Sequence, residues 1–359
     1  MIPEDLGYNQ FFESSKKELG FGEFPVARVI FKSRGLYKVK NGEGEYEAKL
    51  TGKLYNSLSK EDFPVVGDWT SIKIIDEKQT QIIGVLPRKT MITRKHGDKN
   101  KTGDKSDTQI LGANVDVAFI VESTDRDYSL NRFERYCAIV RAGGVKPVLI
   151  LNKIDLISED ELTEFLDQIK TRLPDVEVFT TSTVKRDGLS DLKKYIQKGM
   201  TYCFLGSSGV GKSSLINEII GEEITKTGNI SDYSKRGKHV TTSRQMYFLE
   251  NGGILIDNPG IREIGITDAG QGIDQTFNDI SSLAKSCKFS DCTHTHEPDC
   301  AVLKAVESGE LNEGKYSNFV NLKKEAEYFD MSDQERKNKE RNFGKFLKKA
   351  KKDFKKYGL

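Results

Sequence analysis

The chain has 359 residues, of which 31% are charged, and its mean hydropathy is −0.54. At roughly 100–200 residues per domain, this length predicts two or three domains. No apolar run approaches the ~18 residues that cross a bilayer, and the first residues lack the basic and apolar regions of a secretory signal. We therefore expect a cytoplasmic protein that does not enter membranes.

Residues 1–22 form a polar lead with little pattern, and we expect an N-terminal extension there. In the next region, 23–92, short segments alternate apolar with polar residues, and Gly-containing turns separate several of them. The expected strands are 25–31, 36–40, 45–50, 68–75 and 80–86. Short strands at this density predict a small closed β-barrel of the OB-fold type.

The region 93–266 predicts a domain in which strands and helices alternate. Its first residues, 93–107, are polar and predict a linker or mobile loop. Beyond them we expect strands at 115–123, 146–152 and 176–182 and helices at 130–144 and 158–173. This alternation implies a parallel sheet flanked by helices. The last region, 267–359, is mostly helical with a Cys/His interruption, so the chain is expected to be multidomain.

The strongest motif is GSSGVGKSS, which matches the phosphate-binding loop of P-loop nucleotide hydrolases and lies between an expected strand and an expected helix. Its glycines let successive backbone N–H groups point at phosphate oxygens, and a helix N-terminus favours negative charge. Lys212 is expected to reach the β- and γ-phosphates and Ser213 to bind Mg²⁺. The predicted nucleotide-binding residues are Gly206, Ser207, Ser208, Gly209, Val210, Gly211, Lys212, Ser213 and Ser214. A Gly-rich turn without a ligand is the alternative, which the flanking elements disfavour.

A second motif, NKID, follows an expected buried strand and comprises Asn152, Lys153, Ile154 and Asp155. Asp155 can accept two hydrogen bonds from the Watson–Crick edge of guanine, and adenine lacks that pair of donors. Asn152 can bond the ring edge, and the stem of Lys153 can lie along the base. The tetrapeptide alone also suits a helix cap, but beside a P-loop it predicts guanine.

Two further segments are expected to complete the nucleotide site. Thr181 and Ser182 follow the next strand and fit the loop that backs the base. Asp257 and Gly260 belong to a DNPG motif that also follows an expected strand. In P-loop proteins such an Asp holds Mg²⁺, and the backbone N–H of such a Gly senses the γ-phosphate. The alternative is that DNPG is an ordinary turn without a ligand, which its distance downstream of the P-loop disfavours.

The order of these motifs is permuted, because NKID precedes the P-loop and DNPG comes last, whereas Ras-like proteins begin with the P-loop. A domain whose termini lie close together can be circularly permuted, with new termini at another loop, without changing the site. With VGDW, GKHVTT and a C-terminal Cys/His cluster, this order resembles the ribosome small-subunit-dependent GTPase A family (RsgA, also called YjeQ). The resemblance begins at about residue 25 and runs to the end. It implies an OB-fold, a circularly permuted GTPase domain and a zinc domain, and GTP hydrolysis stimulated by the small ribosomal subunit late in its assembly.

Ras-like proteins orient the attacking water with a Gln directly after the Gly of Asp-x-x-Gly, a position that Ile261 occupies here. A hydrophobic side chain cannot orient water, so the catalytic group must come from elsewhere. Beside Lys212, our catalytic candidate is His239 in the expected switch loop, and the resemblance supports a His there. The alternative is that His239 only orders the switch. Thr241 and Thr242 are both candidates for a further hydroxyl ligand of Mg²⁺.

Three cysteines fall close together beside two histidines. Three thiolates and one imidazole form the closed tetrahedral set of a structural zinc site. The predicted zinc ligands are Cys287, Cys292, His294 and Cys300. His296 is a rival for the fourth position, and the resemblance favours His294. A group of buried cysteines is the alternative, which is also our interpretation of Cys137 and Cys203.

The segment 335–359 contains eleven Lys or Arg and three Asp or Glu. A basic helix of this kind suits phosphate contacts with RNA, although a solvated face or a membrane-surface helix is also possible. The resemblance identifies the polyanion as small-subunit rRNA. We expect a monomer that binds GTP or GDP, Mg²⁺ and one structural Zn²⁺. The rival functions are an RNA-binding module in which GTP mainly sets conformation, and a GTPase of the large subunit or of translation.

Overall fold

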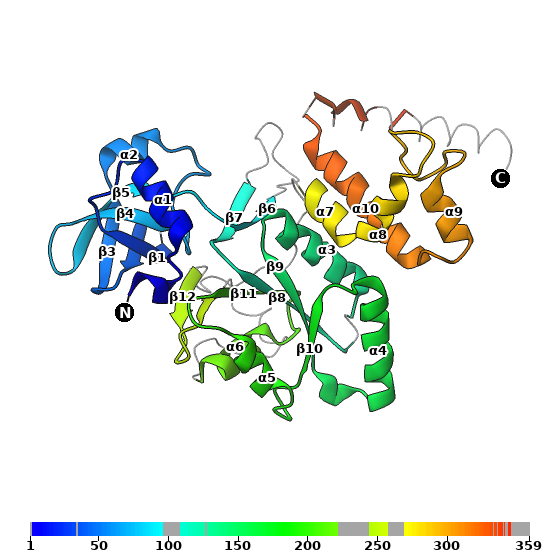
Figure 1. The fold of residues 1–359 in the computed structure, drawn as a ribbon, viewed down its shortest axis with the longest axis horizontal. Coiled ribbons are helices and arrows are strands. Elements are labelled where there is room, and N and C mark those ends of the chain that lie inside the picture. Colours follow the sequence, from blue (N-terminus) through cyan, green and yellow to red (C-terminus); the bar gives the residue numbers. More distant parts are fainter. Residues whose placement is uncertain are drawn as a thin grey trace.

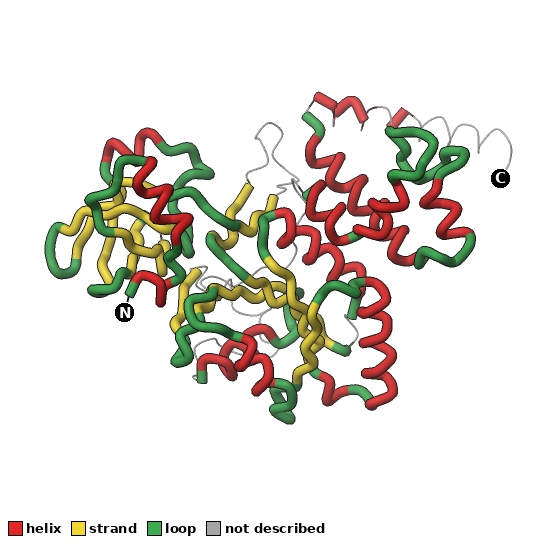
Figure 2. The backbone as a smooth tube through the Cα atoms, viewed as in Figure 1, coloured by secondary structure: helices red, strands yellow, loops and turns green. Residues whose placement is uncertain are grey.

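The computed structural model describes residues 2–33, 35–95, 108–125, 128–221, 244–257 and 269–332, together with 334–335, 337–339, 341 and 344–345. Three parts follow one another along the chain: a strand-rich N-terminal part, a central sheet flanked by helices, and a helical C-terminal part (Figure 1, Figure 2). Within the described ranges, no helix is long and apolar enough to cross a membrane.

The N-terminal strands close into a barrel in the order β1-β2-β3-β5-β4, because β4 pairs back with β1. The strands are β1 (Val26–Ser33), β2 (Leu36–Lys40), β3 (Glu45–Leu50), β4 (Trp69–Ile74) and β5 (Gln79–Val85), with the short helix α2 (Gly52–Ser57) after β3. Alternating side chains such as Val39, Ala48 and Ile82 fill the interior. This closed barrel confirms the predicted N-terminal fold.

The polar lead holds more structure than its sequence pattern predicts. It forms a 3₁₀ turn, η1 (Pro3–Leu6), and the helix α1 (Gln10–Glu18). Asn9 caps the start of α1, because its side chain accepts a hydrogen bond from the N–H of Phe11. Leu6 and Phe12 are buried with Trp69 of the barrel. These few apolar side chains are enough to fix the segment, although they form no visible periodicity.

The central sheet has the order β10-β9-β8-β11-β13-β12, with all neighbours parallel except β12 and β13. Its strands are β8 (Val117–Ser123), β9 (Lys146–Asn152), β10 (Glu177–Thr181), β11 (Thr201–Leu205), β12 (Arg244–Phe248) and β13 (Ile254–Asp257). The connecting elements are α3 (Leu130–Ala142), η2 (Ile154–Leu156), α4 (Glu159–Arg172), α5 (Leu189–Tyr195) and α6 (Lys212–Ile220). Apolar residues of α3 and α4 pack on one face of the sheet, and those of α5 and α6 pack on the other.

Two features join the barrel to the central sheet. Strand β1 pairs with β12, so the barrel and the sheet form one continuous eleven-stranded sheet. The fully buried guanidinium of Arg28 donates hydrogen bonds to the carbonyl oxygens of Leu6, Gly67 and Asn114 at 2.6, 3.2 and 2.9 Å. Arg28 therefore holds the N-terminal segment, the barrel and the entry to the central domain together.

A hairpin of β6 (Met91–Lys95) and β7 (Thr108–Ala113) corrects one expectation. Residues 93–95 belong to β6 rather than to the predicted linker, because the buried Ile92 and Leu111 anchor the hairpin against the core. Residues 96–107 lie outside the described ranges.

The C-terminal helices are α7 (Gly270–Thr276), α8 (Asn278–Ala284), α9 (Ala301–Glu307) and α10 (Glu313–Asp330). Helices α7 and α10 pack against α3, α8 packs against α7, and α9 packs against α8, in the yellow and orange part of Figure 1. The buried carboxylate of Glu134 on α3 accepts hydrogen bonds from Arg172 at the end of α4 and from Asn318 on α10. Arg135 of α3 also forms a two-bond ion pair with Glu325 of α10. Most of the predicted basic tail lies outside the described residues.

Candidate nucleotide and metal sites

The P-loop follows β11 at the carboxyl edge of the sheet. Gly206 has φ 141°, and a Cβ there would lie 2.2 Å from the carbonyl oxygen of Val121. Gly211 has φ 97°, and a Cβ there would lie 2.2 Å from Nδ2 of Asn152. Side chains at either position would clash, so the two glycines are required for the close approach of the loop to β8 and β9.

Lys212, the first residue of α6, turns back into the loop. Its Nζ donates hydrogen bonds to the carbonyl oxygens of Gly206 at 2.8 Å and Ser207 at 2.5 Å. Burial lowers the pKa of Lys212 to about 8, and the negative charges of Glu122 and Asp257 oppose that shift. The ammonium group is thus held where the loop would surround the phosphates of a nucleotide.

The NKID motif is connected to the P-loop by hydrogen bonds. The amide of Asn152 donates to the carbonyl oxygen of Val210 at 2.8 Å and accepts from Oγ1 of Thr181 at 2.9 Å. The hydroxyl of Ser182 donates to the carboxylate of Asp155 at 2.5 Å. Asn152 therefore ties the two motifs together, while the hydroxyl of Ser182 fixes the carboxylate of Asp155.

Two residues of this site were missed by the sequence analysis. Nζ of Lys153 lies 2.7 Å from the carboxylate of Asp125, and Oγ1 of Thr124 donates to the carbonyl oxygen of Lys153 at 2.7 Å. Lys153 has φ 61°, a strained conformation that these contacts help to fix. Asp125 and Thr124 directly follow β8, and their position beside β9 at the carboxyl edge was the available signal.

Asp257 ends β13, beside β11 in the sheet. Burial raises the pKa of its carboxyl, and the charge of Lys212 opposes this effect. The P-loop, Asn152, Asp155, Thr181 and Asp257 thus meet at one edge of the sheet. Four predicted residues of this site lie outside the described ranges, namely His239, Thr241, Thr242 and Gly260.

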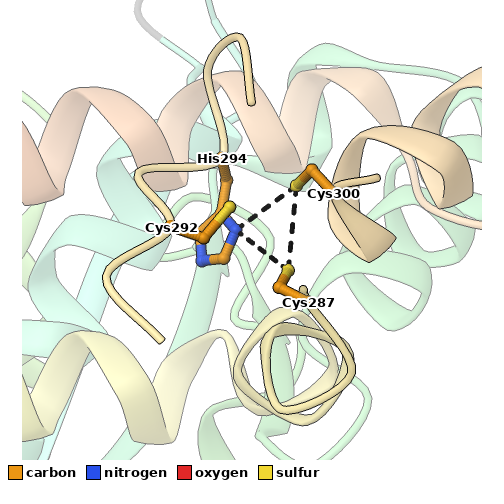
Figure 3. A group of neighbouring side chains, drawn as sticks. All are labelled: Cys287, Cys292, His294 and Cys300. Carbon is orange, nitrogen blue, oxygen red and sulfur yellow. Dashed lines mark hydrogen bonds between the residues drawn. The ribbon is translucent and has the colours of Figure 1, made fainter. Parts of the chain in front are cut away.

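The four predicted zinc ligands come together in the C-terminal part (Figure 3). Cys287 follows α8, Cys300 precedes α9, and Cys292 and His294 lie on the loop between them. The Sγ atoms of Cys287 and Cys300 are 3.8 Å apart and lie 3.6 and 3.5 Å from Nδ1 of His294. All four ligand atoms lie within 4.8 Å of one another.

These distances suit a tetrahedral metal. A centre about 2.3 Å from sulfur and about 2.1 Å from nitrogen implies edges of about 3.8 Å between sulfurs and about 3.6 Å between sulfur and nitrogen. Burial lowers the pKa of His294, which favours the neutral imidazole that a metal needs. Tyr316 donates to the backbone carbonyl of His294 at 2.6 Å and so fixes the loop. His296 is outside this group and contacts Thr295 instead.

Residues 85–267 match the RsgA GTPase family. The chain belongs to this family. An RsgA relative from Bacteroides thetaiotaomicron, a small ribosomal subunit biogenesis GTPase, is 38% identical over 96% of both chains. Another, from Methanosarcina acetivorans, is 41% identical over 86% of this chain and 81% of its own.

Solved structures agree with the RsgA assignment. The crystal structure of YjeQ from Thermotoga maritima is 26% identical, with a TM-score of 0.62 over 83% of this chain and 96% of that one. The structure of YloQ, described as a circularly permuted GTPase, is 23% identical and has a TM-score of 0.60 over 88% and 96% of the two chains. The permuted RsgA fold predicted from the motif order is therefore confirmed.

Proposed function

We infer that this chain is a GTPase of small ribosomal subunit biogenesis, which hydrolyses GTP to GDP and phosphate at the P-loop edge of its central sheet. The observation that carries this conclusion is the similarity to RsgA relatives over nearly the whole chain. The convergence of the P-loop with Asp155 and Asp257 at one sheet edge supports it chemically.

The described residues fit a magnesium-bound GTP. Backbone N–H groups of the loop and Lys212 would hold the phosphates, and Asp155 would accept hydrogen bonds from guanine. The hydroxyl of Ser213 and the carboxylate of Asp257 are the oxygen ligands that Mg²⁺ prefers. Mg²⁺, when bound, neutralises charge on the phosphates. Thr241 or Thr242 would add a hydroxyl, and the N–H of Gly260 would sense the γ-phosphate.

We assign the water-positioning role to His239, with Lys212 stabilising charge on the transferred phosphoryl group. Ile261 supports this proposal, because it occupies the place of the Gln that Ras-like proteins use. Replacing His239 with Ala should abolish most of the subunit-stimulated turnover and leave GTP affinity within about twofold. Unchanged stimulated turnover would exclude a catalytic His239.

For the C-terminal cluster, we propose one structural Zn²⁺ bound by Cys287, Cys292, His294 and Cys300. The donor set is closed, with no position left for substrate, so the ion would stabilise the fold rather than react. The proposed partner surface is the barrel together with the basic segment 335–359, which would contact small-subunit rRNA through its phosphates. We further propose that the protein acts in the cytoplasm as a monomer.

The first experiment compares GTP and ATP hydrolysis by the purified protein, with and without small ribosomal subunits. We expect GTP hydrolysis to rise many-fold with small subunits and ATP hydrolysis to remain low. Large subunits serve as the control, because they would stimulate a GTPase of the other subunit. A GTP hydrolysis rate that neither subunit changes would instead favour the RNA-binding module in which turnover is incidental. Ile261 keeps that alternative open.

A further inference from the structure

Glu122 is a buried carboxylate beside the phosphate-binding loop, and no nucleotide-binding motif includes it. Its side chain is fully buried, one residue before the end of β8. Leu205 at the end of β11 is in register with Ile120, so the loop that follows continues beside Val121 and Glu122. The close approach of Gly206 to the carbonyl of Val121 fixes this arrangement. Glu122 therefore lies next to the floor of the loop.

Charged and polar groups of the site surround Glu122. Its Oε1 forms an ion pair with Nε of Arg132, on the first turn of α3, at 3.0 Å. The Arg132 side chain is 32% exposed, whereas that of Glu122 is 0% exposed, so the pair is open to solvent only on the arginine side. The charge of Glu122 also acts on Lys212 inside the loop and on Tyr136 of α3.

A negative charge at this place has opposite effects on the empty and the occupied loop. In the empty loop it stabilises the ammonium group of Lys212, which otherwise has only backbone oxygens as direct partners among the described residues. When phosphates enter, the same charge repels them across a low-dielectric region. Arg132 reduces that repulsion, because it carries the compensating charge.

We propose that Glu122 is a positioning residue whose charge weakens the binding of guanosine di- and triphosphates by this P-loop, and that Arg132 partly offsets this effect. The inference rests on the proposed GTPase function and adds a determinant of nucleotide affinity to it. A GTPase that must release GDP after hydrolysis gains from such a device, because a lower affinity means faster dissociation.

The test measures dissociation constants for GMP, GDP and a non-hydrolysable GTP analogue by isothermal titration calorimetry at fixed pH and Mg²⁺. Glu122→Gln keeps the shape and removes the charge. We expect the GDP dissociation constant to fall about tenfold, the order of effect for two unit charges about 12 Å apart at an effective dielectric constant of about 20. The effect should be smallest for GMP and largest for the triphosphate.

Arg132→Gln supplies the opposite change, because it removes a positive charge that compensates Glu122. Its dissociation constants should rise, again most for the triphosphate, and the double variant should return close to the original values. Glu325→Gln is the matched control, because it removes a carboxylate of α10 that pairs with Arg135 of α3 and should change none of the three dissociation constants.

An equal change for all three nucleotides, or weaker binding by Glu122→Gln, would overturn the proposal, since packing damage does not scale with phosphate charge. Circular dichroism checks that each variant folds. If Glu122→Gln does not fold, Arg132→Gln alone tests the inference. A rise in its dissociation constants that is the same for any number of phosphates refutes the inference. Failure of the unaltered protein to bind GDP would refute the proposed function instead.

Discussion

At the scale of single residues, Asn152 and Asp155 of the NKID motif have different hydrogen-bond partners. The amide of Asn152 is occupied by Val210 of the P-loop and by Thr181. The carboxylate of Asp155 is oriented by the hydroxyl of Ser182 from one side. Selection of guanine should therefore depend on Asp155, and Asn152 should mainly hold the two loops in register.

We predict that Asp155→Asn changes the preferred base. The amide replaces one acceptor by a donor, which no longer matches guanine but matches xanthine, with a carbonyl at the same ring position. The kcat/KM for GTP should fall about 100-fold or more, and that for XTP should rise. Asp160→Asn, on the exposed side of α4, serves as the control. Loss of both activities would show that Asp155 is needed for folding rather than for selection.

The two histidines of the Cys/His loop make a matched pair for the zinc proposal. His294→Ala removes a ligand atom, and His296→Ala removes a ring that lies outside the cluster. Zinc content, measured by atomic absorption after dialysis, should fall from about one per chain to well below that in the first variant only. If His296→Ala loses the metal and His294→Ala keeps it, the ligand assignment is wrong.

At the scale of elements, α3 connects the nucleotide site to the C-terminal helices. Its first turn carries Arg132, which pairs with Glu122 near the P-loop. Its next residues carry Glu134 and Arg135, which contact Asn318 and Glu325 of α10. One rigid helix thus contacts both regions.

The buried pair between Glu134 and Arg172 allows a stability prediction. Arg172→Met removes the cationic partner of a buried carboxylate, which keeps its hydrogen bond from Asn318, and should lower the free energy of unfolding by about 3–5 kcal/mol. Urea unfolding followed by circular dichroism measures this change. Asp191→Asn, which breaks the exposed pair with Lys194, should have almost no effect. If both variants lost similar amounts of unfolding free energy, burial of the Glu134–Arg172 pair would not explain its contribution to stability.

The sequence predicts elements well where a local pattern defines them. The bounds of β2, β3 and β9 agree with the expected strands, and Ser158 and Glu161 form the capping box expected at the start of α4. Strand β12 was missed, because only its pairing with β13 and β1 makes it a strand. Helix α2 was missed because none of its residues is buried.

The candidate nucleotide site likewise contains residues that a local sequence pattern predicts and residues that it does not. The glycines and Lys212 stand in a fixed local spacing, so the P-loop is recognisable without a structure. Glu122 and Asp125 reach the site only through the register of neighbouring strands. No local pattern marks such residues, because their contacts join segments far apart in the chain.

At the scale of the whole molecule, the barrel is built into the GTPase sheet rather than attached by a linker alone. The pairing of β1 with β12 and the three hydrogen bonds of Arg28 cross the same junction. Gly67 shows how tight this junction is, because a Cβ there would lie 1.9 Å from the carbonyl oxygen of Ala113.

We predict that Arg28→Met weakens the junction. The carbonyl oxygens of Leu6 and Asn114 lose their side-chain donor while remaining buried, and that of Gly67 keeps the amide of Asn114, so the protein should be destabilised by about 3 kcal/mol. Limited proteolysis should then release the barrel as a separate fragment before the GTPase domain is cut. Lys73→Met, on an exposed position of β4, should leave the cleavage pattern unchanged. An unchanged pattern in Arg28→Met would show that strand pairing alone holds the junction.

The shared strands also impose an order on synthesis. Phe31 and Lys32 of β1 pair with Gln245 and Arg244, more than 200 residues later. At about 5–20 residues per second, roughly 10–40 s pass on the ribosome before that partner emerges. During this interval the free end of β1 could capture a strand of another nascent chain. Lys32 and the neighbouring Lys38 place positive charges at that end, a known protection of bare strand edges.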